Sequence, residues 1–225
     1  MFDIFLQYWW QYILVALVSC LHGSFNYSIA FSRLFKKTDV RNYGSGNPGT
    51  TNMFRVFGLR MGLLTFLFDC LKGVVACLVA RWCFVGTSLA AIETAGYIAG
   101  LFVVVGHVFP VYYRFKGGKG VATSIGVMFV MQPVVMLCAL PVMILLILLT
   151  DRMSVMSVAM SIFYIVWAWC VILPQSGALC ALLVTLNFSV VLFAHRHNVL
   201  RLLRGKELPT GVRKAFRGKS DKIVK

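Results

Sequence analysis

The chain has 225 residues, of which 60% are hydrophobic, and its mean hydropathy is +0.83. This composition excludes an ordinary soluble globular domain and indicates a protein embedded in a lipid bilayer. The 22 Lys and Arg residues are gathered in a few segments between apolar runs, which is the pattern of loops that connect membrane helices.

Six apolar runs follow one another along the chain. Each is a candidate membrane helix, because about 20 helical residues cross a hydrocarbon core of about 30 Å. The runs cover residues 4–32, 61–80, 84–113, 121–149, 153–173 and 177–194. The first run has no small-residue cleavage site after a basic start, which favours a retained helix over a signal peptide. The seven cysteines lie in apolar surroundings without a metal-ligand pattern, so we expect small core residues.

The basic residues predict the orientation of these helices. Of the Lys and Arg residues, six fall in 33–60, three in 114–119 and ten in 196–225, whereas only Arg81 falls in the loop 81–95. The positive-inside rule therefore places the three basic segments in the cytoplasm and the loop 81–95 outside. An even number of crossings must then separate 114–119 from the C-terminal tail.

The number of crossings is even if the run 121–149 forms two membrane helices. Gln132-Pro133 lies near its middle, and proline kinks or breaks a helix. The fold class is then an all-α polytopic membrane protein with seven transmembrane helices, the N-terminus outside and the C-terminus cytoplasmic. The turn 150–157 returns to the cytoplasmic side. We expect one integral membrane domain over 1–207 and a basic cytoplasmic tail over 208–225.

The segment "GSGNPGTTN" at residues 44–52 is polar within this apolar chain. Its glycines superficially match nucleotide-binding fingerprints, but no strand precedes them and Thr50-Thr51 replaces the Lys-Ser/Thr pair of a P-loop. Glycine-rich loops also turn backbone N–H groups inward as an anion-binding nest. The predicted phosphate cradle comprises Gly44, Ser45, Gly46, Asn47, Gly49, Thr50, Asn52 and Arg55. The alternative is an ordinary polar turn between two membrane helices.

A second polar loop, "GHVFPVYYRFKGGKGVAT" at 106–123, strengthens the phosphate hypothesis. It combines glycines with cations directly before a helix whose N-terminal amides also favour an anion. The candidate binding residues here are Lys116, Gly117, Gly118, Lys119 and Gly120, of which Lys119 is the preferred charge. His107 is a further candidate, with a capping or packing role as the alternative.

A third polar element, "FAHRHNVLRLLRGKE" at 193–207, follows the last apolar run. His195 and Asn198 share one helix face, and Arg201 extends a related stripe. A neutral imidazole could orient or deprotonate a hydroxyl at physiological pH. Arg204 and the residues beyond 210 are interpreted as cations that bind anionic lipid headgroups.

Asp69 and Lys72 are charged residues inside the apolar run 61–80. Charged side chains are costly in a bilayer, so these two should face the interior of the bundle. Their i,i+3 spacing predicts a structural ion pair.

Four segments carry a family resemblance: "DVRNYGSGNPGTTNMFRVFG" (39–58), "DCLKG" (69–73), "GHVFPVYYRFKGGKGVATSIG" (106–126) and "HRHNVLRLLRGKE" (195–207). Together and in this order, they resemble the bacterial acyl-phosphate:glycerol-3-phosphate acyltransferase family. The resemblance implies a seven-helix enzyme of the bacterial cytoplasmic (inner) membrane with its active site at the cytoplasmic face. Such an enzyme moves a fatty acyl group from acyl phosphate to the sn-1 hydroxyl of glycerol 3-phosphate, giving lysophosphatidic acid and phosphate.

The resemblance also implies the residues that surround the substrates. They are Ser45, Arg55, Lys119, Ser157, His195 and Asn198, with catalytic roles for Ser45, Lys119, His195 and Asn198 and a binding role for Ser154 beside Ser157. Two departures stand out. The segment "GSFNYS" at 23–28 lacks the proline that usually follows Gly-Ser, which predicts an altered start of the helix. Thr50 replaces the usual alanine, which is harmless to a site built from backbone amides.

The expected mechanism is direct attack of the substrate hydroxyl on the acyl carbonyl, with His195 or the substrate's own phosphate accepting the proton. No covalent enzyme intermediate, metal or cofactor is required, and no His-x-x-x-x-Asp pair of thioester-using acyltransferases is present. Expected partners are both substrates, membrane lipids and, transiently, a soluble acyl-phosphate-forming enzyme, but no nucleic acid. The rival classes are an organic-phosphate transporter, with a site near the midplane, and a metal-dependent phosphotransferase, for which the seven acids are too scattered.

Overall fold

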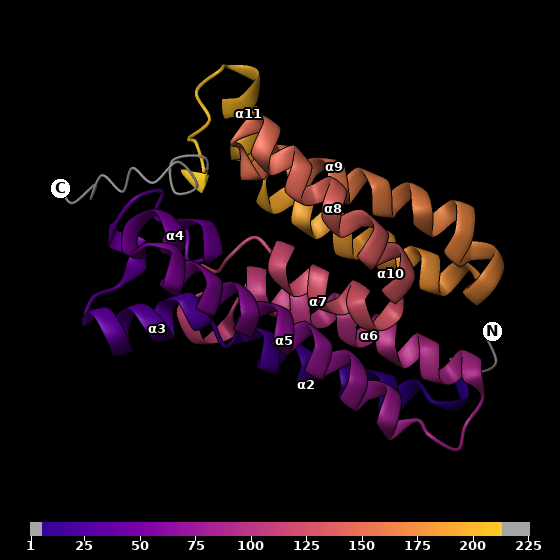
Figure 1. The fold of residues 1–225 in the computed structure, drawn as a ribbon. Coiled ribbons are helices and arrows are strands. Elements are labelled where there is room, and N and C mark those ends of the chain that lie inside the picture. The colour runs from indigo at the N-terminus through magenta and orange to yellow at the C-terminus, as the bar shows by residue number, and fades with distance from the viewer. Residues whose placement is uncertain (1–5, 213–225) are drawn as a thin grey trace.

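The computed structural model describes residues 6–212, and over that range every regular element is helical (Figure 1). The longer helices are α2 (Trp9–Ser24), α3 (Tyr27–Lys36), α4 (Thr50–Phe57), α5 (Leu59–Cys83), α6 (Leu89–Val108), α7 (Val121–Met131), α8 (Pro133–Thr150), α9 (Met153–Trp167), α10 (Leu173–Ala194) and α11 (Arg196–Leu203). Short helical turns η1 (Val40–Asn42) and η2 (Val111–Tyr113) lie in the loops, and a π-helical turn η3 (Ala168–Ile172) joins α9 to α10.

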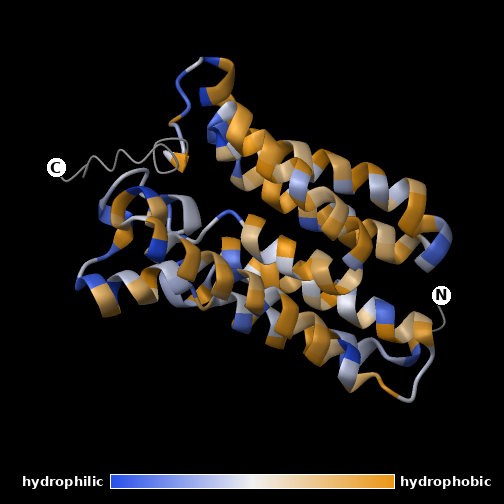
Figure 2. Cartoon of the chain, in the orientation of Figure 1, coloured by the Kyte–Doolittle hydropathy of each residue, from blue (hydrophilic) through white to orange (hydrophobic). Residues whose placement is uncertain are grey.

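The helices form two groups (Figure 1). One contains α2, α5, α6 and α7, and the other contains α8, α9 and α10; the two are joined where α10 packs against α6 and α7. The short helices α4 and α11 lie at the same end of the molecule (Figure 1). Hydrophobic residues dominate the long helices, and hydrophilic residues gather around α4 and α11 and at the turns of the opposite end (Figure 2). Large apolar side chains such as Leu63, Val134 and Leu145 are exposed on the outside, as expected where lipid surrounds a bundle.

Glycines allow two helix pairs to approach closely. A Cβ on Gly23 of α2 would lie 2.1 Å from the Val103 carbonyl oxygen of α6, and one on Gly106 of α6 would lie 2.1 Å from the Cys20 carbonyl oxygen of α2. The contact between α5 and α7 has the same form, because a Cβ on Gly126 would lie 2.0 Å from a carbonyl oxygen of α5. Small residues at such contacts let backbones pack closely within a membrane. These contacts hold α2 against α6 and α5 against α7 within the first helix group.

Three breaks interrupt the apolar runs. The first run is two helices, because Phe25 is extended after α2 and Asn26 caps α3, so the expectation of one helix over 4–32 was wrong. The predicted break at Gln132-Pro133 is confirmed: Gln132 has non-helical φ −142° and ψ 60°, and Pro133 begins α8. Near the start of α10, Gly177 has φ 82° and ψ 173°, a conformation that glycine adopts without strain.

Five helical segments within the described range are long and apolar enough to cross a membrane. They are Trp9–Lys36, Leu59–Cys83, Leu89–Tyr113, Pro133–Thr150 and Met153–Ala194. The last has 42 residues and contains the break at Gly177, and α7 is apolar but has only 11 residues. The all-helical, multi-pass architecture is therefore confirmed.

Two smaller expectations were wrong. The loop predicted over 81–95 is shorter, because α5 continues to Cys83 and α6 begins at Leu89. The cysteines are all free, but Cys83, Cys138 and Cys170 are exposed rather than in the core. Apolar sequence surroundings do not distinguish core from lipid-facing positions, because both faces of a membrane helix are apolar.

Candidate active site

The charged residues inside α5, Asp69 and Lys72, lie beside the site. Lys72 Nζ lies 2.9 Å from Asp69 Oδ1, and both side chains are buried, so the predicted ion pair is confirmed. Lys72 Nζ also lies 2.7 Å from Nδ1 of buried His107 and donates to the Phe25 carbonyl oxygen at 3.1 Å. His107 is thus held by Lys72, while its ring also faces the cavity described next.

A cavity of about 200 Å³ lies between the two helix groups, at the end of the molecule that carries α4 and α11. All four residues predicted to be catalytic line it. The complete set of predicted residues in its wall is Ser45, Asn47, Gly49, Thr50, Asn52, Arg55, His107, Lys119, Ser154, Ser157, His195, Asn198 and Arg201. The three polar loops, far apart in sequence, therefore meet at one place.

The other predicted residues lie beside this cavity or shape its loops. Lys116, Gly117 and Gly118 line a neighbouring groove that also contains Ser45, Lys119 and Asn198. Gly44, Gly46 and Gly120 have positive φ angles of 60°, 71° and 85°, which glycine adopts without strain. Gly120 caps α7.

Asn52 holds the first glycine loop in shape. Its Oδ1 accepts the Ser45 N–H at 3.0 Å, and its Nδ2 donates to the carbonyl oxygens of Val40 and Tyr43 at 3.2 and 3.0 Å. The polar atoms of Asn52 are thus used inside the loop. Thr50 Oγ1 differs, because it is buried in the cavity wall and has no hydrogen-bond partner among the described residues.

A hydrogen-bonded chain joins the second and third loops. Lys119 Nζ donates to Asn198 Oδ1 at 2.5 Å, and Asn198 Nδ2 donates to Glu207 Oε1 at 2.6 Å. Glu207 also accepts from Ser154 Oγ and from Arg201 Nε, both at 2.8 Å. Glu207 is therefore a central site residue that the sequence reasoning missed. The available signal was its position as the one acid among the cations of 195–207.

His195 is buried, and its Nδ1 lies 2.8 Å from the Val191 carbonyl oxygen. A carbonyl oxygen can only accept, so Nδ1 carries the proton and Nε2 presents a lone pair. Burial and the nearby Lys119 lower the pKa of His195 to about 4, so the ring is neutral at physiological pH. Asn198 shares a helix face with His195 in the predicted pattern, but its amide is engaged by Lys119 and Glu207.

The cations of the site are partly desolvated. Burial lowers the pKa of Lys119 to about 8, although the nearby Glu207 carboxylate opposes this shift. Burial also lowers the pKa of Arg55, whose Nη2 donates to the Pro209 carbonyl oxygen at 2.9 Å. Burial raises the pKa of Glu207, but hydrogen bonds from Asn198, Ser154 and Arg201 outweigh it, and the net shift is downward.

The segment after Glu207 closes over the site. Leu208 and Thr210 line the cavity, and the Thr210 N–H donates to the Asp151 carbonyl oxygen at 2.8 Å. The Thr210 hydroxyl also bonds to the Asp151 carboxylate. Of the predicted tail 208–225, residues 213–225 lie outside the described residues. The boundary after 207 stays a prediction.

The remaining wall of the cavity is apolar. Its side chains come from α5, α7, α8 and α9 and include Phe66, Ile125, Leu140, Met143, Ile144 and Ile147. One cavity thus presents cations, hydroxyls and a neutral imidazole together with a hydrocarbon surface. This combination suits a ligand with an anionic head and an apolar chain.

Comparisons with known proteins agree with this chemistry. The profile of the family described as "Glycerol-3-phosphate acyltransferase" matches residues 13–205. A protein named glycerol-3-phosphate acyltransferase from Clostridioides difficile (strain 630) is 39% identical over 210 residues, which is 91% of this chain and 98% of the relative. A relative of the same name from Finegoldia magna is 39% identical over 199 residues, covering 88% and 96% of the two chains.

Two solved structures share the fold. The crystal structure of PlsY (YgiH), described as an integral membrane glycerol 3-phosphate acyltransferase in its glycerol 3-phosphate form, has a TM-score of 0.79 at 31% identity. It covers 91% of this chain and 98% of that chain. The lysophosphatidic acid form has a TM-score of 0.75 at 30% identity, with coverages of 88% and 94%.

Proposed function

The chain belongs to the glycerol-3-phosphate acyltransferase family, and we propose that it transfers a fatty acyl group from acyl phosphate to the sn-1 hydroxyl of glycerol 3-phosphate. The products are lysophosphatidic acid and inorganic phosphate. The observation that carries this proposal is the cavity itself, in which cations and His195 face an apolar wall. Both substrates carry a phosphate, and the donor also carries a hydrocarbon chain.

The cations allow two anions to lie close together. At about 4 Å, two like unit charges repel by about 4 kcal/mol at an effective dielectric constant of about 20. Arg55, Lys119 and Arg201 line the cavity and supply the opposing charge, and Lys116 lies in the adjoining groove. Ser45 and the partnerless Thr50 hydroxyl add neutral donors on the first glycine loop.

The apolar wall accommodates the acyl chain of the donor. Phe66 of α5, Ile125 of α7 and Met143 of α8 lie on one side of the same cavity whose other side holds the cations. Burying methylene groups against such a wall contributes about 0.8 kcal/mol for each CH₂. The reacting carbonyl then lies at the boundary between the two walls, beside the phosphate-binding loops.

The reaction is a direct displacement at the acyl carbonyl. The hydroxyl oxygen forms the new C–O bond, the bond to the phosphate oxygen breaks, and the hydroxyl proton leaves. His195 Nε2 accepts the hydrogen bond of the hydroxyl and orients it, because Nδ1 is held by Val191. A pKa of about 4 makes His195 a weak base, so the proton ends on a phosphate, whose second pKa is about 6. Lys119 stabilises the charge that develops on the leaving phosphate, and Asn198 holds Lys119.

The proposed topology has seven crossings, by α2, α5, α6, α7, α8, α9 and α10. The break at Gly177 supports two crossings within Met153–Ala194. The N-terminus is then outside, and the three basic loops and the site face the cytoplasm of a bacterial inner membrane. There the site is open to soluble glycerol 3-phosphate, and a soluble acyl-phosphate-forming enzyme can contact it transiently. An organic-phosphate transporter remains the alternative class, and a site reachable from both sides would favour it.

The test is lysophosphatidic acid formation by the purified protein in detergent. We expect activity with glycerol 3-phosphate and acyl phosphate, little activity with acyl-CoA of the same chain length, and no loss in EDTA. The matched control is His195→Ala. Because His195 orients the hydroxyl and does not take its proton, this variant should lose up to about 10²-fold through misplacement of the nucleophile, at unchanged folding. Efficient use of acyl-CoA, or inhibition by EDTA that magnesium reverses, would contradict the proposal.

A further inference from the structure

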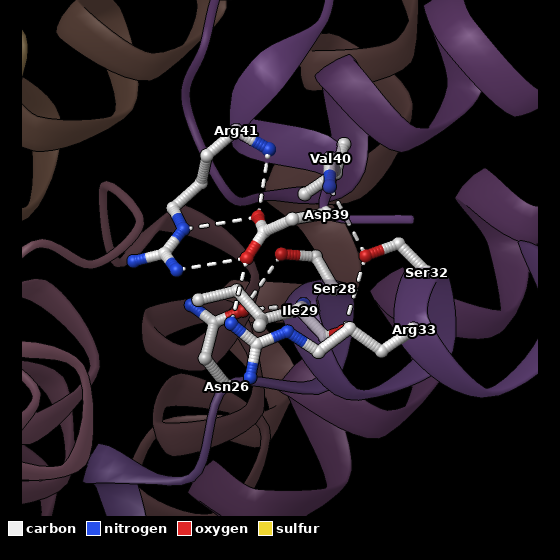
Figure 3. Close-up of polar contacts among 8 residues, drawn as sticks. All are labelled: Asn26, Ser28, Ile29, Ser32, Arg33, Asp39, Val40 and Arg41. Atoms are coloured by element: carbon white, nitrogen blue, oxygen red, sulfur yellow. Dashed lines mark hydrogen bonds and ion pairs between the residues drawn. The ribbon is translucent and has the colours of Figure 1, made fainter. Parts of the chain in front are cut away.

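Asn26 is fully buried at the break between α2 and α3 and uses both ends of its side-chain amide. Figure 3 shows the contacts of its amide oxygen. Oδ1 accepts the Ile29 N–H at 3.1 Å and the Ser28 hydroxyl at 2.6 Å. Nδ2 donates to the Pro48 carbonyl oxygen at 3.2 Å, 22 residues away. The orientation of the amide is fixed, because a backbone N–H can only donate and a carbonyl can only accept. The oxygen of Asn26 therefore caps α3, and its nitrogen holds another segment.

That other segment is the first glycine loop of the site. Pro48 immediately precedes Gly49, the residue that caps α4. The loop residues on both sides of Pro48, including Asn47 and Thr50, line the cavity. Asn52 holds the beginning of the loop through Ser45, whereas Asn26 holds its middle. The loop is thus tied at two points by two buried asparagines.

The helix α3 is itself tied to the chain that enters this loop (Figure 3). Ser32 Oγ of α3 accepts the Val40 N–H at 3.2 Å. The carboxylate of Asp39 lies 2.8 Å from both Arg33 of α3 and Arg41 of η1, and hydrogen bonds from Arg41 hold the pKa of Asp39 well below its usual range. The segment 37–43 therefore cannot shift independently of α3, and α3 serves as a platform for the loop.

We propose that Asn26 is a positioning residue for the phosphate-binding loop: its amide nitrogen fixes the Pro48 carbonyl and thereby the backbone of residues 47–50 that faces the substrate phosphate. This inference rests on the proposed function, because it takes the cavity to be the substrate site. Asn26 itself does not line the cavity. Its effect is transmitted through the backbone at Pro48.

The variants Asn26→Ser and Asn26→Ala separate the loop tie from the helix cap. Serine caps a helix about as well as asparagine, but its side chain is too short to reach the Pro48 oxygen, whereas alanine removes both contacts. Loss of a neutral hydrogen bond weakens an interaction by several-fold. Both variants should therefore raise KM for glycerol 3-phosphate about 3- to 10-fold, with kcat changed less than about twofold. Asn26→Ala, which also loses the helix cap, should lower the thermal unfolding midpoint in detergent further than Asn26→Ser does.

Ser28→Ala is the matched control, because it removes a contact to Asn26 Oδ1 and leaves the Pro48 bond in place. Its KM should equal that of the wild type. A wild-type KM in Asn26→Ser, or a loss of kcat without a change in KM, would refute the positioning role while leaving the proposed function intact. An inactive wild-type protein would instead refute the proposed function. In that case, direct binding of radiolabelled glycerol 3-phosphate to the wild type and Asn26→Ser decides the positioning role, and equal affinities would refute it.

Discussion

Lys119 Nζ donates a hydrogen bond of 2.5 Å to Asn198 Oδ1, although 79 residues separate the two side chains in sequence. Asn198 in turn donates to Glu207. Glu207 therefore acts on the Lys119 ammonium indirectly, because it holds the Asn198 amide to which Lys119 donates. Because Asn198 bonds through its oxygen to a cation and through its nitrogen to an anion, one neutral residue links the second polar loop to the third.

The replacement Lys119→Ala tests the role of this cation. A hydrogen bond to a charged group contributes about 1.5–3 kcal/mol, so kcat/KM for glycerol 3-phosphate or acyl phosphate should fall roughly 10- to 150-fold. Initial rates with each substrate varied in turn will show which phosphate Lys119 contacts. Arg204→Ala is the control, because Arg204 is exposed at the end of α11. Equal losses in the two variants would favour a diffuse effect of surface charge over a defined site.

The pH dependence should report the same group. The pKa of Lys119 is lowered to about 8 by burial, and an anion binds the protonated form. Raising the pH through 8 removes the ammonium, so kcat/KM should fall about tenfold for each pH unit above that value, because this ratio reports the free enzyme. Phosphate monoesters are already doubly charged there, since their second pKa is about 6. Lys119→Arg should abolish this fall in kcat/KM, because arginine stays protonated in this pH range. If the fall near pH 8 persists in Lys119→Arg, another group is responsible for it.

The sequence predicted much of the site because its chemistry lies in contiguous motifs. Glycines beside Arg55 and Lys119 singled out the two loops that meet at the cavity, and the i,i+3 spacing of Asp69 and Lys72 predicted their ion pair. Such short-range patterns depend on local geometry alone. The sequence could not predict that Asn198 would turn from His195 towards Lys119, because that contact depends on how α7 and α11 meet.

Glu207 and Asn26 show the same limit. Glu207 follows α11 in a loop, and only the folded chain brings Ser154 to its carboxylate. The segment 23–28 was predicted to depart from the family pattern, but the bond from Asn26 to Pro48 joins two segments 22 residues apart and could not be predicted from it. The break after Ser24 was missed for a related reason, since the apolar run continues through it. Periodicity reports which residues are apolar, not where a helix ends.

Removing the Glu207 carboxylate should destabilise the site. Glu207→Ala leaves buried Ser154 and Asn198, together with Arg201, without their shared acceptor, and each unsatisfied buried donor costs about 1–3 kcal/mol. The thermal unfolding midpoint in detergent should fall, and kcat/KM should fall with it because Asn198 no longer holds Lys119. Lys206→Ala changes an exposed neighbour and should leave both values unchanged. An unaltered midpoint in Glu207→Ala would mean that water replaces the carboxylate at no cost.

The proposed topology with seven crossings differs from one in which only the five segments selected by length and composition cross the membrane. The segment Met153–Ala194 contains 42 residues, which would span about 63 Å as one helix at about 1.5 Å per residue, twice the thickness of a hydrocarbon core. Divided near Gly177, each half is about the length of one crossing. The short α7, with 11 residues, reaches about half that distance and needs the extended residues at its ends to complete a crossing.

Cysteine labelling from each side of the membrane, in a cysteine-free background, decides between the two topologies. Seven crossings place Arg152→Cys and Lys206→Cys in the cytoplasm and Gln175→Cys outside. With five crossings, α7 and α8 cross together, so Arg152→Cys would be labelled from outside and Gln175→Cys would lie within the bilayer, unlabelled from either side. Ser154 is unsuitable for this test, because it is buried against Glu207. Outside labelling at Arg152→Cys would overturn the seven-crossing topology and place the start of α9, with Ser157, on the side opposite to the basic loops.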